Sequence, residues 1–264
     1  MLMEVKNQFK VMFLSIKYAL MREMLNKVTF ITNVLFMILN NASFIIQWII
    51  FFSLKDNIGG YDLKTVILLW GLTAGIFGMS RFFFAKAFEL SDVINTGKLD
   101  SYLVQPKSVL LSVITSDIEV SAIGDMLYGY IMLFIYGFNI PIFILFTLFV
   151  ILGGILVTSI SIILSSLSFW FQKSDILADT GNGLMTNFAT YPDGIFKGLV
   201  KVLLYTIIPV GLSVYIPIKV LTKFNLVTLL IIIFIDILFV IFAFIIFYRG
   251  LKKYSSSNLM VAKI

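Results

Sequence analysis

The chain has 264 residues, of which 60% are hydrophobic and only 13% charged, whereas soluble domains average about 45–50% apolar and about 25% charged residues. It contains neither Cys nor His, which excludes disulfides, thiol nucleophiles, imidazole bases and ordinary zinc or haem sites, so we expect no metal site. The net charge of +6 comes from basic residues that flank apolar runs, which indicates a topology signal rather than nucleic-acid binding. Because apolar runs long enough to cross a bilayer recur throughout, the composition predicts an all-α integral membrane protein.

The N-terminal segment, residues 1–28, is predicted to be an amphipathic helix. From Val5 to Lys27, apolar residues recur at helical spacing on one side and lysines occupy the other. Such a helix lies in the membrane interface. The alternative is that it is the solvated start of the first span.

The first span is expected from Phe30 to Leu54, and amides recur in it every seven residues, at Asn33, Asn40 and Gln47. Seven residues are nearly two helical turns, so the three amides share one face. Unpaired amides are costly in lipid, so this face should contact protein or a wet pathway. Helix packing and a substrate pathway both remain open.

The second span is expected from Thr65 to Phe88. Gly71 and Gly75 form a G-x-x-x-G pattern that favours close helix packing. Arg81 and Lys86 lie toward the end of this span, as expected for a helix that ends on the basic, cytoplasmic side.

Four further spans complete a six-span prediction, with boundaries near Ile118–Phe138, Ile142–Phe171, Ile176–Thr190 (short) and Leu226–Tyr248. Residues 191–218 are apolar but punctuated by prolines, which suits broken helices better than one straight span. We therefore expect a re-entrant extracellular segment marked by Tyr191, Pro192, Pro209 and Pro217.

The placement of basic residues favours six spans over seven. With six spans and both termini in the cytoplasm, 14 of the 20 Lys and Arg residues lie inside, Lys173 and Lys263 among them. A seventh span would move the basic "RGLKK" tail outward, against the positive-inside rule. Lys219 and Lys223 fit the choice of six least, because they remain outside.

Asp236 falls mid-way along the last span. An acid there costs about 2.5–3.5 kcal/mol, which the surrounding apolar residues outweigh at about −0.4 kcal/mol each. Such an acid marks either a functional site or a helix-pairing contact, and the sequence leaves both open.

Residues 89–108 form a polar connection between the second and third spans that is long enough for a short helix lying along the membrane. It could receive a partner protein. It could equally be an ordinary loop in which Gly97 stops one helix and Pro106 starts the next.

The order of several motifs resembles the permease subunits of ABC-2 type ABC exporters, in the branch typified by drug and viologen export permeases. The residues that carry the resemblance begin in the polar connection with Ile94, Gly97, Leu99, Asp100, Leu103 and Pro106. They continue with "SDIEVSAIGDMLYGY" at 116–130, "FW" at 169–170, "YP" at 191–192, Pro209 and "YIP" at 215–217. Gln105 departs from the basic residue that this branch often has before the proline.

The resemblance implies a single permease domain over residues 1–264 with an ABC-2 exporter fold. The N-terminal helix would be a connecting helix, residues 89–108 a cytoplasmic coupling helix received by an ABC ATPase, and residues 191–218 re-entrant helices that close the exit. The chain has no G-x-x-x-x-G-K-[ST] motif, so it cannot cradle ATP phosphates by that device. We therefore expect ATP and Mg²⁺ in partner ATPase subunits, a second permease that is identical or paralogous, and a bacterial plasma membrane.

Two other classes of function are alternatives. A membrane enzyme would need convergent acids, and the nearest set is Asp117, Glu119 and Asp125, which solvation or capping also explains. An ion-coupled secondary transporter or channel is the second alternative, but the two halves of the chain show no similarity of the kind that inverted repeats produce. The few fixed charges of the spans suit an amphiphilic or hydrophobic cargo such as a drug, peptide or lipid, and they also suit plain contact with membrane lipid.

Overall fold

The computed structural model describes residues 2–171 and 174–255, and these form helices without any strand. This confirms the all-α prediction. Lys173 and Lys263, which the charge count places inside, lie outside the described residues. The elements in chain order are α1 Leu2–Glu23, α2 Lys27–Leu54, α3 Leu63–Phe88, α4 Leu90–Asn95, α5 Asp100–Leu103, α6 Val109–Ile114, α7 Ser121–Gly137, α8 Ile140–Ser166, η1 Leu167–Phe169, α9 Asp175–Ala189, η2 Asp193–Ile195, α10 Gly198–Thr206, the π-helix η3 Gly211–Tyr215, α11 Ile216–Thr222 and α12 Leu226–Leu251.

Four long helices in the described part of the chain are apolar enough to cross a membrane, namely α2, α3 continued by α4, α8 continued by η1, and α12. The pair made by α10 and the continuous η3–α11 segment, bent by 78°, is either a broken fifth span or a re-entrant loop. The predicted third and fifth spans correspond to α7 and α9, with 17 and 15 residues. At 1.5 Å per residue these reach about 25 and 22 Å, so the six-span topology stays a prediction.

The four long helices begin at residues whose side chains accept a hydrogen bond from the helix backbone. The caps are Asn26, Asp62, Asn139 and Asn225, each bonded to the N–H three residues ahead. Such a cap satisfies one of the backbone donors that a helix start leaves free. The Asn26 cap also explains why α2 starts at Lys27, a few residues before the expected Phe30.

α3 is the centre of the bundle, because α2, α7, α8 and α9 all pack on it. The G-x-x-x-G pattern lies where the backbone of α7 approaches the backbone of α3. A Cβ on Gly129 of α7 would lie 2.7 Å from the carbonyl oxygen of Gly71 and 3.1 Å from the Cα of Gly75. The two backbones therefore meet where none of the three residues has a side chain, as the pattern predicts.

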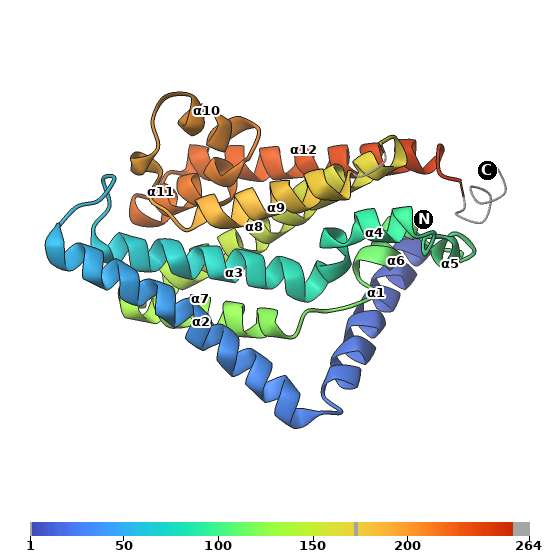
Figure 1. Cartoon of the computed structure of the whole chain (residues 1–264), viewed down its shortest axis with the longest axis horizontal. Coiled ribbons are helices and arrows are strands. Elements are labelled where there is room, and N and C mark those ends of the chain that lie inside the picture. The colour runs from blue at the N-terminus through green and yellow to red at the C-terminus, as the bar shows by residue number, and fades with distance from the viewer. Residues whose placement is uncertain (1, 172–173, 256–264) are drawn as a thin grey trace.

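The bundle has two distinct ends along its long axis (Figure 1). One end, here called the α5 end, gathers the start of α1, the short helices α4, α5 and α6, and the end of α12. The other, the α10 end, carries the 55–62 loop, α10 and α11. The elements predicted to be cytoplasmic thus lie together, and so do those predicted to be extracellular.

α1 runs across the long axis of the bundle (Figure 1), and some of its apolar side chains are uncovered. Phe9 and Phe13 are 64% and 69% exposed. In water these rings would be an unfavourable apolar surface, whereas a helix lying in the membrane interface buries such a face in lipid. This geometry agrees with the expected interfacial helix.

The contact between α3 and α7 generates the first prediction. Gly129→Ala should lower the free energy of unfolding by about 1–3 kcal/mol, because the added methyl meets backbone that cannot move aside. Gly183→Ala in α9 is the matched control, since nothing lies within 4 Å of its would-be Cβ, and Ala is a better helix former than Gly. Thermal unfolding in detergent measures both, and equal stability of the two variants would contradict the close packing.

Candidate functional site

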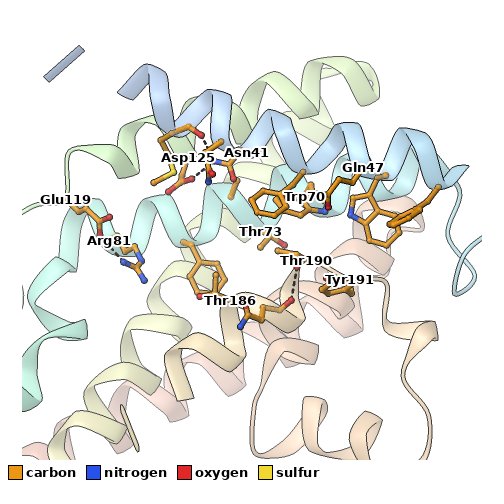
Figure 2. A pocket seen from close by; sticks show the side chains of 18 residues that line it. Asn41, Gln47, Trp70, Thr73, Arg81, Glu119, Asp125, Thr186, Thr190 and Tyr191 are labelled. Carbon is orange, nitrogen blue, oxygen red and sulfur yellow. Dashed lines mark hydrogen bonds and ion pairs between the residues drawn. The ribbon is translucent and has the colours of Figure 1, made fainter. Parts of the chain in front are cut away.

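A groove of about 580 Å³ lies between α2, α3, α7 and α9 (Figure 2). Its aromatic region is built from rings of three elements. Phe44 stacks on Trp70 with ring centroids 5.3 Å apart, and Trp48 meets the edge of Tyr191 at 5.9 Å. These pairs hold large apolar surfaces at fixed angles along the wall of the groove.

The opposite region of the groove carries paired charges (Figure 2). Arg81 on α3 forms an ion pair with Glu119 at 3.1 Å. Asn41 on α2 donates a hydrogen bond of 2.6 Å to the carboxylate of Asp125 on α7. The groove is therefore amphiphilic, with aromatic rings in one region and partnered polar groups in the other.

The three amides of α2 lie on the exposed side of that helix, and two of them line the groove. Asn40 and Gln47 belong to the groove wall, whereas Asn33 is exposed and does not reach it. None of the three is buried against another helix of this chain, so packing within one chain does not account for them. Lining of a pathway remains a prediction for Asn40 and Gln47.

Asn41, which is not part of the seven-residue repeat, is the amide that binds another helix. Asn41 is 8% exposed and, with Ile45 and Trp48, forms the buried face of α2. The sequence carries a signal for it, because positions 41, 45 and 48 follow helical spacing. That Asp125 is its partner could not be read from the sequence, since 84 residues separate them.

The predicted coupling residues divide into buried anchors and exposed positions. Ile94 and Leu99 are 5% and 0% exposed and belong to a cluster that includes Phe247 of α12. Gly97 has φ +77°, a left-handed conformation that favours glycine. Asp100 opens α5 and accepts a hydrogen bond of 2.9 Å from Tyr254. These four residues shape the segment.

The longest exposed run of the segment is residues 103–107, here called the tip. Leu103 and Val104 are 41% and 85% exposed, and Gln105, Pro106 and Lys107 are exposed as well. Val104 is not among the predicted coupling residues, although its side chain is the most exposed apolar group of the tip. Of the predicted residues, only Leu103 and Pro106 are exposed enough to offer a partner much side-chain surface.

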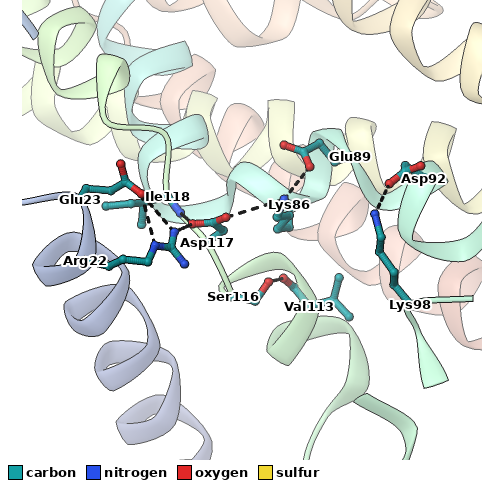
Figure 3. A network of polar contacts seen from close by, with 10 residues as sticks. All are labelled: Arg22, Glu23, Lys86, Glu89, Asp92, Lys98, Val113, Ser116, Asp117 and Ile118. Carbon is teal, nitrogen blue, oxygen red and sulfur yellow. Dashed lines mark hydrogen bonds and ion pairs between the residues drawn. The ribbon is translucent and has the colours of Figure 1, made fainter. Parts of the chain in front are cut away.

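A chain of alternating charges links α1 to the start of the coupling segment (Figure 3). Arg22 of α1 contacts Asp117 at 2.6 Å, Asp117 lies 3.8 Å from Lys86, and Lys86 contacts Glu89 at 2.6 Å. The groups are partly exposed, so each pair contributes little stability by itself. Together they hold the 115–120 connector between the last turn of α1 and the last turn of α3.

At the α10 end, the predicted re-entrant residues lie at the breaks between short helices. Pro192 directly precedes η2, Pro209 occupies the bend between α10 and η3, and Pro217 is in the first turn of α11. All three are buried, whereas Tyr191 is 48% exposed and faces the groove. Tyr215 donates to the carbonyl of Phe188 at 2.7 Å, which ties η3 to α9.

Asp193, which the sequence did not single out, holds this end together. Its buried carboxylate accepts hydrogen bonds from Lys219 at 2.9 Å and Tyr205 at 2.7 Å, and Lys201 lies 3.7 Å away. Burial alone would raise the pKa of Asp193, but the bonds from Lys219 and Tyr205 outweigh it and hold this pKa below the usual value. Lys219, which fits the six-span topology poorly by charge alone, is thus neutralised by an acid.

A family model described as ABC-2 family transporter protein matches residues 13–258. The chain belongs to this family. The match makes it a multi-pass membrane protein and the permease component of an ABC transporter. The curated proteins and the solved structures give no match to the chain.

The acids of this ABC-2 chain do not assemble into an enzyme-like cluster. Asp117, Glu119 and Asp125 bind Arg22, Arg81 and Asn41 respectively. In the part of the chain that the structure describes, no three acids lie close enough to hold a metal ion. Each of the three carboxylates thus has a partner of its own.

Asp236 of this ABC-2 chain is 3% exposed on α12, so it points into the bundle. Neither carboxylate oxygen has a hydrogen-bond partner among the described residues. Within the described part of one chain, no hydrogen bond from Asp236 to another helix therefore supports the helix-pairing interpretation. Its role stays a prediction.

The groove generates a prediction that cysteine labelling can test. The test is simple because the chain has no cysteine of its own. Asn40→Cys and Gln47→Cys should react at least tenfold faster with a charged, water-soluble thiol reagent than Leu39→Cys. The thiolate that reacts forms in water and not in lipid, and Leu39 is 62% exposed but does not line the groove. Equal rates at the three positions would show that the groove is not a wet pathway.

Asp193 generates a prediction with a pH dependence. Asp193→Asn should lower stability by about 1–2 kcal/mol at pH 7, because it removes a charged acceptor while Lys219 stays half-exposed. The folded pKa lies below the unfolded value of about 3.9, so this contribution is present above that pH and is lost as the pH falls through the folded pKa. Thermal unfolding should therefore show the two proteins converging below about pH 4. The exposed Asp56 gives the control Asp56→Asn, and a constant difference at all pH values would contradict the assignment.

Proposed function

We propose that this chain is the permease subunit of an ATP-driven exporter in which two permeases, identical or paralogous, work with two cytoplasmic ABC ATPase subunits. The ATPases bind the tip and hydrolyse ATP with Mg²⁺, while this chain forms the path that the cargo takes. The α5 end then faces the cytoplasm, and both termini lie on that side of a bacterial plasma membrane.

The single observation that carries the proposal is the construction of the coupling segment. Leu99 is fully buried in the bundle, whereas Val104, five residues later, is 85% exposed. A segment anchored by its own leucine and presenting an uncovered apolar tip has the form of a surface that a partner covers. Force applied to such a tip reaches the bundle because the segment cannot slide on it.

The groove supports the cargo class. Rings such as Trp70 and Trp48 favour an apolar body, and the partnered Arg81, Glu119 and Asp125 favour a polar group at one end. This combination suits an amphiphilic or hydrophobic cargo, such as a drug, peptide or lipid. A second permease facing the groove would complete its open side, with membrane lipids around the pair.

The residues of the re-entrant segment support a closed exit in this state. The Asp193 cluster joins η2, α10 and α11, and Thr73 of α3 donates to the carbonyl of Ala189 at 3.0 Å. The end of α9 is therefore fastened to the central helix α3, and Tyr215 ties η3 to α9. Export would require these contacts to rearrange when the ATPases close.

Co-purification from mild detergent tests the proposal. Tagged wild-type chain should bring down a soluble ABC ATPase, identified by mass spectrometry, and Val104→Asp should reduce its amount at least tenfold, because a charge would be buried against the partner. Leu25→Asp is the matched control, since Leu25 is also 85% exposed but lies between α1 and α2.

Two results would count against the proposal. Equal retention of the ATPase by Val104→Asp and Leu25→Asp would remove the tip from the interface. Absence of any ATPase from stable wild-type protein would remove the energy source and favour an ion-coupled secondary transporter or channel, for which the buried Asp236 would be the first residue to test.

A further inference from the structure

The two residues that bracket the tip both bond to tyrosines from the end of α12. Tyr254 donates a hydrogen bond of 2.9 Å to Asp100, the first residue of α5. The hydroxyl of Tyr248 lies 2.9 Å from that of Ser108, which caps α6. The tip leaves the bundle after one of these contacts and returns at the other.

Aromatic packing fixes the position of the tyrosines. The ring of Phe169 in η1 meets the edges of Tyr254 at 6.1 Å and Phe247 at 5.5 Å. Gly250 lies so close to Phe169 that a Cβ there would overlap the ring. The chain after α12 is thereby folded back onto the coupling segment instead of leading away from it.

α12 differs from α3 in how firmly its neighbours hold it. α3 is buried along most of its length, but α12 buries only Ile232, Asp236, Ala243, Phe247 and Gly250. It packs mainly on α8, with smaller contacts to α11 and η1. A displacement delivered to α12 therefore meets less resistance from packing than the same displacement delivered to α3.

We propose that Tyr248 and Tyr254 are positioning residues that transmit movement of the tip to α12, so that α12 moves when the ATPases close. This inference rests on the proposed function, because the ATPase is what moves the tip. The covalent route from the tip leads to α3 and α7, and the tyrosine hydroxyls add a second route to a helix 140 to 154 residues away in sequence.

The test uses the complex of tagged chain and ATPase in lipid nanodiscs, with a fluorophore sensitive to its environment on Leu230→Cys. Leu230 is 55% exposed near the other end of α12, and this chain has no other thiol. A complex without that substitution gives the background from thiols of the ATPase. The signal is the fluorescence change on trapping with ATP and vanadate.

Tyr248→Phe combined with Tyr254→Phe removes the two hydroxyls and keeps the rings. We expect the ATP-dependent change at Leu230 to fall at least threefold, with the ATPase still bound and still hydrolysing ATP. Each single change should have a smaller effect. Tyr130→Phe is the matched control, because it loses a hydroxyl contact of 3.2 Å to Thr147 between α7 and α8 and should keep the full signal.

The outcomes separate this inference from the proposed function. An unchanged signal in the double variant overturns the inference, and so does a complex without any ATP-dependent signal at Leu230. Loss of the bound ATPase from the double variant overturns it too, since the tyrosines would then only shape the tip. If the unsubstituted chain binds no ATPase, the proposed function fails first, and co-purification reveals this before any label is used.

Discussion

The arrangement depends on the contact between α3 and α7, where glycines let two backbones touch. Close approach is what holds helices together in a medium that offers no hydrophobic drive for their association. With α3 and α7 fixed against each other at Gly71, Gly75 and Gly129, α2 and α9 complete the walls of the groove. The coupling segment follows α3 directly and leads through α6 to the start of α7, so the same contact helps to set its position.

Patterns local in the sequence predicted the long elements well. The expected spans Phe30–Leu54, Thr65–Phe88 and Leu226–Tyr248 agree with α2, α3 and α12 to within a few residues, because hydropathy and Asx caps act over one helix. The seven-residue spacing placed Asn40 and Gln47 on one face of α2, but it included Asn33, which does not reach the groove. The short helices α7 and α9 carry too few residues for composition to decide whether they cross the bilayer.

The features that sequence patterns missed are contacts between distant segments. Asn41 binds Asp125, Asp193 binds Lys219, and Tyr254 binds Asp100, and no periodicity within one helix relates such partners. For the same reason the motif around residues 94–106 could not predict which of its leucines is buried. Leu99 lies in a cluster with residues of α6, α8 and α12, whereas Leu103 is exposed. Burial depends on the tertiary neighbours, not on the residue type.

The Asx caps of α3, α8 and α12 have a consequence for how the bundle could move. Asp62, Asn139 and Asn225 lie at the α10 end and belong to the same helices whose first N–H groups they satisfy. When a helix with its own cap tilts, the cap moves with it and its hydrogen bond to the helix backbone is kept. This matters because an unpaired backbone group is costly in a low-dielectric medium. Tilting of these three helices therefore leaves their cap hydrogen bonds intact and changes mainly their side-chain packing, which favours movement of each helix as a rigid body.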